Sequence, residues 1–312
     1  MRILSCTVPP EAEGRMVKGI LRSELQLSYT LLKSLKWREN AILLNGRSVH
    51  VNVRVHAGDT VSVALEERAP RAPLCCAGAE APDIVYEDDD LLVLNKPAGV
   101  AMHPKSGDVS APSLAAMLTA YLGAGSVPHF VSRLDKGTSG LLIAAKNGHI
   151  HDRLRRALHS DALCREYRAI AIGSVAPPAG VIDAPIARKE SSCLERVVDF
   201  TNGERAVTHY QVLKTTELYS LVALQLETGR THQIRVHMSY LGYSLVGDFL
   251  YNPKYAGNQI DRVTDAQTKE KTADYPIHRQ ALHAHKISFP HPMTGEHMEF
   301  CVPMPEDMLR LV

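Results

Sequence analysis

A proline-rich stretch divides the chain into two parts of very different size, and this division constrains the fold most strongly. Residues 68–82 read Arg-Ala-Pro-Arg-Ala-Pro-Leu-Cys-Cys-Ala-Gly-Ala-Glu-Ala-Pro, with three prolines and no apolar periodicity. Such a composition is typical of an interdomain linker. The sequence therefore predicts a small unit over 1–67, a linker over 68–82 and a large unit over 83–312.

The overall composition excludes several classes of protein. Lys and Arg total 35 against 34 Asp and Glu, so the net charge of +1 gives no global signal for nucleic acid. No apolar run approaches the ~18 residues that a membrane span needs. The first 30 residues are charged where a signal peptide would be apolar. We therefore expect a cytoplasmic protein with no membrane partner, whose six cysteines are free thiols.

Positive charge is concentrated in the small unit. Residues 15–54 hold eight basic and two acidic side chains, whereas everything beyond residue 66 sums to −2. A local basic patch can follow a phosphate backbone, although a solvated surface would show the same count. The basic residues that we expect to contact such a phosphate backbone are Arg15, Lys18, Arg22, Lys33, Lys36 and Arg47.

The apolar pattern of the small unit predicts two short helices followed by short strands. Apolar residues have helical spacing over 16–25 and again over 31–35, and an Asn-Gly turn at 45–46 separates two apolar runs. This order, ending in "VNVRVHAGDTV" at 51–61, resembles the small S-four RNA-binding domain. The resemblance implies that this unit binds RNA.

The large unit is predicted to be α+β, with a mainly antiparallel mixed sheet flanked by helices and loops. Helices are expected over 113–122 and 149–158. Strands are expected over 84–86, 91–94, 141–145, 166–172, 206–213, 219–227 and 281–289.

Two motifs of the large unit carry the strongest chemical signal. "SRLDKGTSG" at 132–140 places a carboxylate, Asp135, at the mouth of a small-residue turn. "LETGRTHQIRVH" at 226–237 places two arginines and two histidines within eight residues. A guanidinium beside an Asp holds that carboxylate ionised and aimed, as a nucleophile requires. Each charged residue alone fits a surface ion pair, whereas the two motifs together favour an active site.

Five ordered blocks of the large unit resemble the pseudouridine synthases of the RluA type. The first is "VYEDDDLLVLNKPAGVAMHP" at 85–104, and the second is the loop at 132–140. They are followed by "REYRAI" at 165–170, "LETGRTHQIRVHMSYLGYSLVGDFLY" at 226–251 and "RQALHAHKISFPHPMTGE" at 279–296. The chain departs from the family pattern at Ser132, where a His is common, and in a polar insertion at 254–275.

The resemblance implies the pseudouridine synthase fold and the isomerisation of uridine to its carbon-glycoside isomer within RNA. The reaction needs no cofactor, nucleotide or metal. The implied catalytic residues are Asp135 as the essential carboxylate, Arg235 as its partner in preference to Arg230, and Tyr167 against the uracil. The implied substrate-binding residues are Arg133, Leu134, Thr138, Arg230, His232 and Gln233.

The implied substrate is a structured RNA whose target uridine is turned out of its helix. Arg133 is expected to fill the vacated gap in the base stack. Ribosomal RNA is the expected partner of a monomeric enzyme, with transfer RNA as the alternative substrate.

Two other classes of function match parts of the sequence. A catalytically inactive RNA-binding protein would suit the small unit, but Asp135, Tyr167 and Arg235 are all present. A zinc-dependent hydrolase or deaminase would suit the 15 histidines, but neither H-E-x-x-H nor H-x-E…C-x-x-C occurs.

Overall fold

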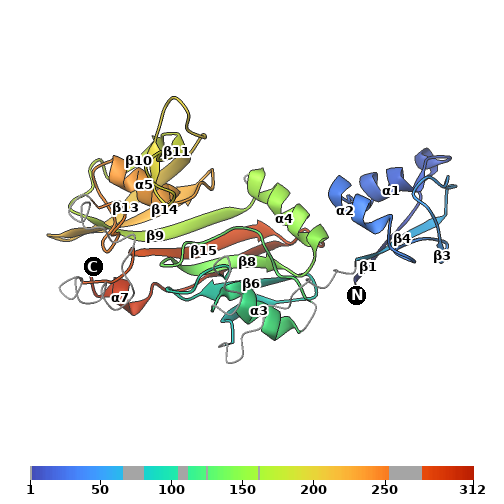
Figure 1. The fold of residues 1–312 in the computed structure, drawn as a ribbon, viewed down its shortest axis with the longest axis horizontal. Coiled ribbons are helices and arrows are strands. Elements are labelled where there is room, and N and C mark those ends of the chain that lie inside the picture. The colour runs from blue at the N-terminus through green and yellow to red at the C-terminus, as the bar shows by residue number, and fades with distance from the viewer. Residues whose placement is uncertain (1, 66–80, 105–111, 124–125, 161, 253–275) are drawn as a thin grey trace.

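The computed structural model describes residues 2–65, 81–104, 112–123, 126–160, 162–252 and 276–312. The insertion at 254–275 and nearly all of the predicted linker at 68–82 lie outside the described residues. The remaining chain forms a four-stranded sheet, a 10-stranded sheet and a two-stranded sheet (Figure 1). None of the helices described here is both long and apolar enough to cross a membrane.

The small N-terminal unit is an antiparallel sheet with two short helices and its own core. The sheet order is β1-β4-β2-β3. Val17 and Ile20 of the first helix share one apolar cluster with Val61 and Val63 of the fourth strand. The elements are β1 (Arg2–Thr7), a 3-10 turn (Pro10–Ala12), α1 (Val17–Ser23), α2 (Tyr29–Leu35), β2 (Ile42–Leu44), β3 (Arg47–Ser48) and β4 (Thr60–Leu65).

Local sequence explains the helix start and the turn in this unit. The Ser28 hydroxyl accepts a hydrogen bond from the Leu31 amide at 3.2 Å and thereby begins α2. Asn45 and Gly46 both have positive φ, 49° and 77°, as a tight hairpin turn between β2 and β3 requires. The strand β1 was not predicted, because the sequence reading placed its first element at residue 16.

The large sheet has the order β10-β13-β14-β9-β15-β8-β6-β5, with β7 on β8 and β16 on β15. Its pairs are antiparallel except β15 with β8, so the sheet is mixed, as predicted. The strands are β5 (Ile84–Glu87), β6 (Leu91–Lys96), β7 (His129–Phe130), β8 (Ser139–Ala145), β9 (Cys164–Ile172), β10 (Ala179–Asp183), β13 (Val207–Thr215), β14 (Tyr219–Leu226), β15 (Leu282–Pro290) and β16 (His297–Cys301).

Helices cover both faces of the sheet near β6 and β8, which explains the continuous apolar runs of these strands. Leu92 and Leu94 share a core with Leu114 and Leu118 of α3 (Leu114–Leu122). The alternate residues of β6 share a second core with Ile150 of α4 (Gly148–His159). The remaining elements are β11 (Ile186–Arg188), β12 (Arg196–Val198), α5 (Gln233–Tyr240) and α7 (Glu306–Leu309).

The order of the strands brings distant segments of sequence together. β15 lies between β8 and β9, so the loop before β8 and the middle of β9 lie on either side of one strand. The segment after β14 leads directly into α5, which packs on β12 and β13. The two motifs singled out in the sequence therefore converge on one region of the large sheet.

Candidate active site

A cleft of about 1010 Å³ contains both sequence motifs. The residues that line it include 132–136 before β8, Tyr167 of β9, and 226–235 at the start of α5. One face of α4 forms a further wall. The cleft is therefore built where loops of the large sheet meet, and Asp135 lies within it.

Asp135 lies in a short turn that is held in place by hydrogen bonds to its backbone carbonyls. The Asp135 carbonyl accepts a hydrogen bond from the Thr138 amide at 3.0 Å, which closes the turn. The Lys136 carbonyl accepts from the Gly99 amide at 2.8 Å and from the Lys96 ammonium at 3.2 Å. The Asp135 side chain is 27% exposed. A carboxylate in this position is fixed in direction but open to a substrate.

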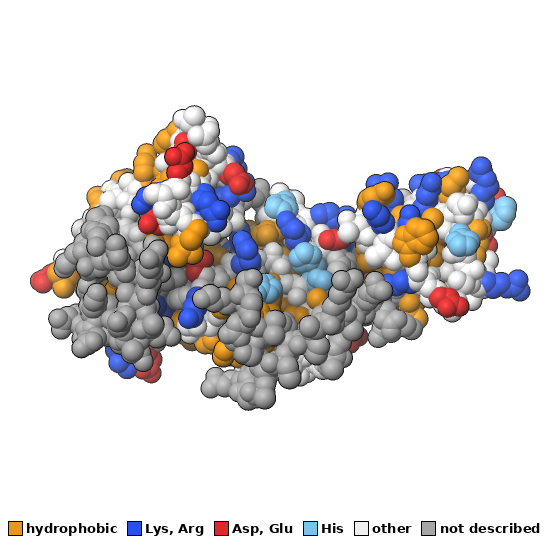
Figure 2. All heavy atoms as spheres, in the orientation of Figure 1, with side chains coloured by type: hydrophobic (Ala, Val, Ile, Leu, Met, Phe, Trp, Pro, Cys, Tyr) orange, Lys and Arg blue, Asp and Glu red, His pale blue; other side chains and the backbone are white. Residues whose placement is uncertain are grey.

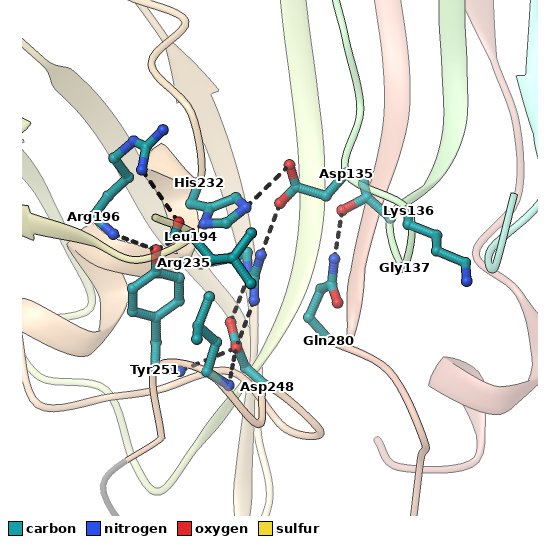
Figure 3. A network of polar contacts seen from close by, with 12 residues as sticks. Asp135, Lys136, Gly137, Leu194, Arg196, His232, Arg235, Asp248, Tyr251 and Gln280 are labelled. Atoms are coloured by element: carbon teal, nitrogen blue, oxygen red, sulfur yellow. Dashed lines mark hydrogen bonds and ion pairs between the residues drawn. The ribbon is translucent and has the colours of Figure 1, made fainter. Parts of the chain in front are cut away.

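Arg235 holds this carboxylate and is itself held by Asp248 (Figure 3). Its Nε and Nη2 donate to the two carboxylate oxygens of Asp248 at 2.7 and 2.8 Å, and its Nη1 donates to Asp135 Oδ2 at 3.0 Å. Burial disfavours the charge of Arg235, but the hydrogen bonds and charges of Asp248 and Asp135 outweigh it and raise the pKa of Arg235. The guanidinium is thus a permanent cation that orients Asp135.

His232 faces the other carboxylate oxygen. Its Nε2 lies 3.8 Å from Asp135 Oδ1, and its Nδ1 lies 2.7 Å from the Tyr251 hydroxyl (Figure 3). The Tyr251 oxygen accepts from the Arg196 amide at 2.9 Å, so its own proton is available to Nδ1. Burial raises the pKa of Tyr251 to about 12 and lowers that of His232. This arrangement favours a neutral imidazole with its proton on Nε2, directed at Asp135.

Tyr167 lines the same cleft from β9. The residue is 5% exposed, and burial is the main cause of a raised pKa for its hydroxyl, with Asp135 acting in the same direction. The phenol therefore remains protonated near neutral pH. Its position in the lining lets a flat ring contact a base that enters the cleft.

The structure places the other predicted substrate-binding residues in different environments. Arg133 is exposed on the cleft wall. Leu134 is buried in the main core, and the buried Thr138 hydroxyl accepts from the side-chain Nε2 of Gln280 at 3.2 Å. Of these residues, Arg133 is the one with a side chain free to reach RNA, while Leu134 and Thr138 support the turn.

The side chains of Arg230 and Gln233 make their contacts within the protein. The Gln233 side-chain nitrogen donates to Val207 O and Thr208 Oγ1 at 2.9 and 3.0 Å, and its oxygen accepts from the Arg230 amide. Arg230 forms an ion pair with Glu204. The structure thus places Arg235, and not Arg230, against Asp135, and gives Gln233 a bracing position.

The cleft lining is strongly cationic, and Figure 2 shows basic and histidine side chains along the hollowed middle of this face. Among the described lining residues the acids are Asp135 and Glu227. The Lys and Arg residues are Arg133, Lys136, Arg155, Arg165, Arg196, Arg205, Arg230 and Arg235. A polyanion is the complementary ligand for such a surface.

The basic side chains predicted for the N-terminal unit are all exposed. They lie on α1, on and after α2, on β3, and before α1. These residues are Arg15, Lys18, Arg22, Lys33, Lys36 and Arg47. The exposed Trp37 follows Lys36, whose ammonium lies 5.0 Å from the indole centroid. RNA binding by this unit stays a prediction.

Histidines of the C-terminal strands have partners within the protein. His283 Nδ1 contacts Ser139 Oγ at 2.9 Å, and His285 Nδ1 contacts Val302 O at 2.6 Å. His291 groups with Asp88 and Asp90 at a distance suited to metal ligation. However, its Nε2 is hydrogen-bonded to Asp88 at 3.0 Å, which accounts for the arrangement without an ion.

Sequence reasoning missed three residues that support the site. Asp248 and Tyr251 lie in the quoted block at 226–251, and Lys96 lies in the block at 85–104. Lys96 is fully buried and donates to the Pro97 and Val100 carbonyls at 2.9 and 2.8 Å. Burial lowers the pKa of Lys96 to about 8. For Lys96, the available signal was a charged residue two positions after the apolar run at 91–94.

The chain is similar to several known proteins. The family model for RNA pseudouridylate synthase matches residues 90–240. The uncharacterized RNA pseudouridine synthase YlyB of Bacillus subtilis is 40% identical over 319 residues, which covers 100% of this chain and 98% of the relative. Ribosomal large subunit pseudouridine synthase D of Yersinia pestis is 36% identical, over 99% and 93% of the two chains.

A solved structure shows the same fold. The human RNA pseudouridylate synthase domain containing 4 superposes with a TM-score of 0.56 and 27% identity, over 73% of this chain and 90% of that chain. The chain therefore belongs to the RNA pseudouridylate synthase family, and its resemblance to the RluA type is confirmed. It is an RNA pseudouridine synthase, an isomerase.

Proposed function

We propose that this chain converts specific uridines of structured ribosomal RNA to pseudouridine, with Asp135 as the essential carboxylate. Support for ribosomal RNA comes from relatives named ribosomal large subunit pseudouridine synthase D, such as that of Yersinia pestis. Support for the residue roles comes from the cleft geometry. A cytoplasmic location and a monomeric state remain predictions from the sequence.

The isomerisation is balanced without a redox partner or an energy source. The N1–C1′ glycosidic bond breaks, the uracil turns, and a C5–C1′ bond forms. C5 loses a proton and N1 gains one. Asp135 either attacks the ribose or removes a ribose proton to give a glycal, and both routes need a carboxylate held beside the sugar.

The observation that carries this proposal is the placement of Asp135 between a guanidinium and an imidazole in a cationic cleft. Arg235 binds one carboxylate oxygen at 3.0 Å, and the His232 ring faces the other at 3.8 Å. Because Asp248 fixes Arg235 from the opposite side, the carboxylate is oriented before substrate arrives. Preorganised groups of this kind lower the barrier of a reaction because no rearrangement is needed.

Tyr167 and Arg133 account for recognition of a flipped nucleotide. We assign Tyr167 to the face of the uracil, where its ring stacks and its hydroxyl lies near the departing C5 proton. We assign Arg133, which is exposed beside Asp135, to the gap left in the RNA stack. A planar guanidinium stacks on bases and pairs with phosphate at the same time.

The decisive test is Asp135→Asn, which preserves the size of the side chain but removes its charge. With RNA labelled by tritium at uridine C5, wild type should release tritium to water, and the variant should release none. RNA affinity should change little, because the RNA phosphates are bound by the cationic residues of the cleft and not by the carboxylate of Asp135. Appreciable single-turnover activity of Asp135→Asn would overturn the assignment.

The substrate is tested by mapping pseudouridines in all RNA from cells with and without this gene. We expect the sites that disappear to lie in ribosomal RNA. Loss confined to transfer RNA would replace the proposed substrate. Wild-type protein that binds RNA without releasing tritium would indicate a binding protein.

A further inference from the structure

One face of α4 forms part of the cleft wall but has no part in the reaction described above. Its members all line the cleft that contains Asp135. We call them the α4 cleft face, and they are His151, Arg155, Leu158 and His159. Spacings of three, four and eight residues place side chains on one side of a helix. The opposite side of α4 is buried through Ile150 and Leu154.

We propose that the α4 cleft face binds the phosphate backbone of the RNA strand that flanks the target nucleotide. This inference rests on the proposed function, because it takes RNA as the occupant of the cleft. It assigns to α4 a contact surface in addition to the exposed Arg133 and the basic N-terminal unit.

Arg155 carries a positive charge for which the described part of the chain offers no ion-pair partner. Among the described residues it is exposed and forms no ion pair, whereas Arg205 pairs with Glu227 at 2.8 Å and Arg235 pairs with two carboxylates. A guanidinium without a protein partner retains its full attraction for a phosphate. Arg155 is therefore the strongest phosphate ligand on this face.

The histidines and the leucine extend this contact along the strand. His151 Nδ1 lies 3.8 Å from Asp152, and its ring lies 5.6 Å from that of His129 on β7. From His151 to His159 the helix rises about 12 Å, the length of roughly three stacked nucleotides. Leu158 lies between the polar side chains and offers an apolar contact to a ribose or base.

The position of α4 predicts the path of the RNA strand across the protein. Arg156 lies outside the cleft lining, and its Nη2 donates to the Gln26 carbonyl of the N-terminal unit at 3.4 Å. Figure 1 shows α4 between the large sheet and α2. An RNA strand that leaves Asp135 along the α4 cleft face therefore runs toward the exposed basic side chains of that unit.

The test compares Arg155→Gln with Arg310→Gln. Glutamine has a helix propensity similar to that of arginine and stays polar, but it is shorter and carries no charge. Arg310 is exposed on the C-terminal segment, outside the cleft lining, so its variant controls for net charge. Binding to one ribosomal RNA fragment is measured for each protein across several salt concentrations, and the Tm of each is checked.

We expect Arg155→Gln to weaken RNA binding about tenfold at low salt. It should also reduce the slope of log affinity against log salt by about 1, as loss of one phosphate contact requires. The KM for RNA should rise accordingly. Arg310→Gln should match wild type, and Arg155→Glu should bind more weakly than Arg155→Gln because it repels phosphate.

Wild-type affinity and salt slope for Arg155→Gln would overturn the inference and leave α4 as a solvated face. Equal losses for the two glutamine variants would also overturn it, because net charge alone would then explain them. Tritium release by wild type is measured on the same RNA. Absence of that release refutes the proposed function, whereas release with an unchanged Arg155→Gln refutes only the role of α4.

Discussion

The buried pair between Arg235 and Asp248 should determine both the stability of the large unit and the alignment of Asp135. In Asp248→Asn, the new Oδ1 can still accept the Leu250 and Tyr251 amides, which Asp248 now binds at 3.1 and 3.2 Å. The new Nδ2 is a donor placed against a donor of Arg235. The substitution therefore removes one charge and opposes two N–H groups at the same place.

The expected loss in the free energy of unfolding follows from the burial of both side chains. The Asp248 side chain is 0% exposed and that of Arg235 is 9% exposed. Removing one partner of a buried pair costs about 3–5 kcal/mol. Because Asp135 remains as a second counter-charge, we expect a loss near the lower end, about 3 kcal/mol. For a chain of this size that loss lowers Tm by roughly 6–12 °C.

The assay is urea unfolding of wild type, Asp248→Asn and Glu306→Gln, together with single-turnover tritium release. Glu306 pairs with Arg310 at an exposed position, so its change should cost well under about 1 kcal/mol. Misalignment of Arg235 should slow the reaction of Asp248→Asn by roughly 100-fold. Equal stability losses in the two variants, with wild-type turnover, would refute the reasoning about the buried pair.

Three other variants test the surroundings of the site. Burial lowers the pKa of Lys96 to about 8, so between pH 8 and its usual value near 10.5 the unfolded state binds the extra proton. Wild type should therefore gain stability relative to Lys96→Met as pH rises through that window in urea unfolding, and a constant difference would contradict this. Tyr251→Phe removes the donor to His232 Nδ1, so the pKa of His232 should rise. The acid limb of the kcat/KM profile should then move to higher pH. An unmoved limb would show that this hydrogen bond does not control the pKa of His232. Lys33→Ala combined with Arg47→Ala should reduce the salt slope of RNA binding by up to about 2 without changing which uridine is modified, and unchanged binding would make these side chains a solvated surface.

Local signals in the sequence located many elements of the fold. The apolar runs at 91–94 and 141–145 lie within β6 and β8, and the helix expected over 113–122 is α3. These segments have strong periodicity or continuous apolar character and are bounded by turn residues. The short strands β10, β11 and β12 were missed, because strands of three to five residues are too short to show a clear apolar alternation.

The site could be predicted only in part. Asp135 and Arg235 stand in dense motifs, whereas the role of Asp248 depends on a turn that returns the chain to α5 thirteen residues after Arg235. The role of Tyr251 depends likewise on the position of His232. Such contacts are properties of tertiary packing, and no spacing in a single sequence encodes them. The α5 helix was also missed, since its motif was read for charge and not for periodicity.

The start of α5 shows how the fold produces the geometry around Asp135. His232 has φ of 59°, a left-handed conformation that is uncommon for residues other than glycine, and it is the residue immediately before the helix. Arg235 follows three positions later, nearly one helical turn on, and reaches the same carboxylate. One sharp bend followed by one turn therefore places a cation against one oxygen of Asp135 and a neutral imidazole 3.8 Å from the other. Local strain of this kind persists where surrounding contacts enforce it, and here the contacts of Tyr251 with His232 and of Asp248 with Arg235 supply that enforcement.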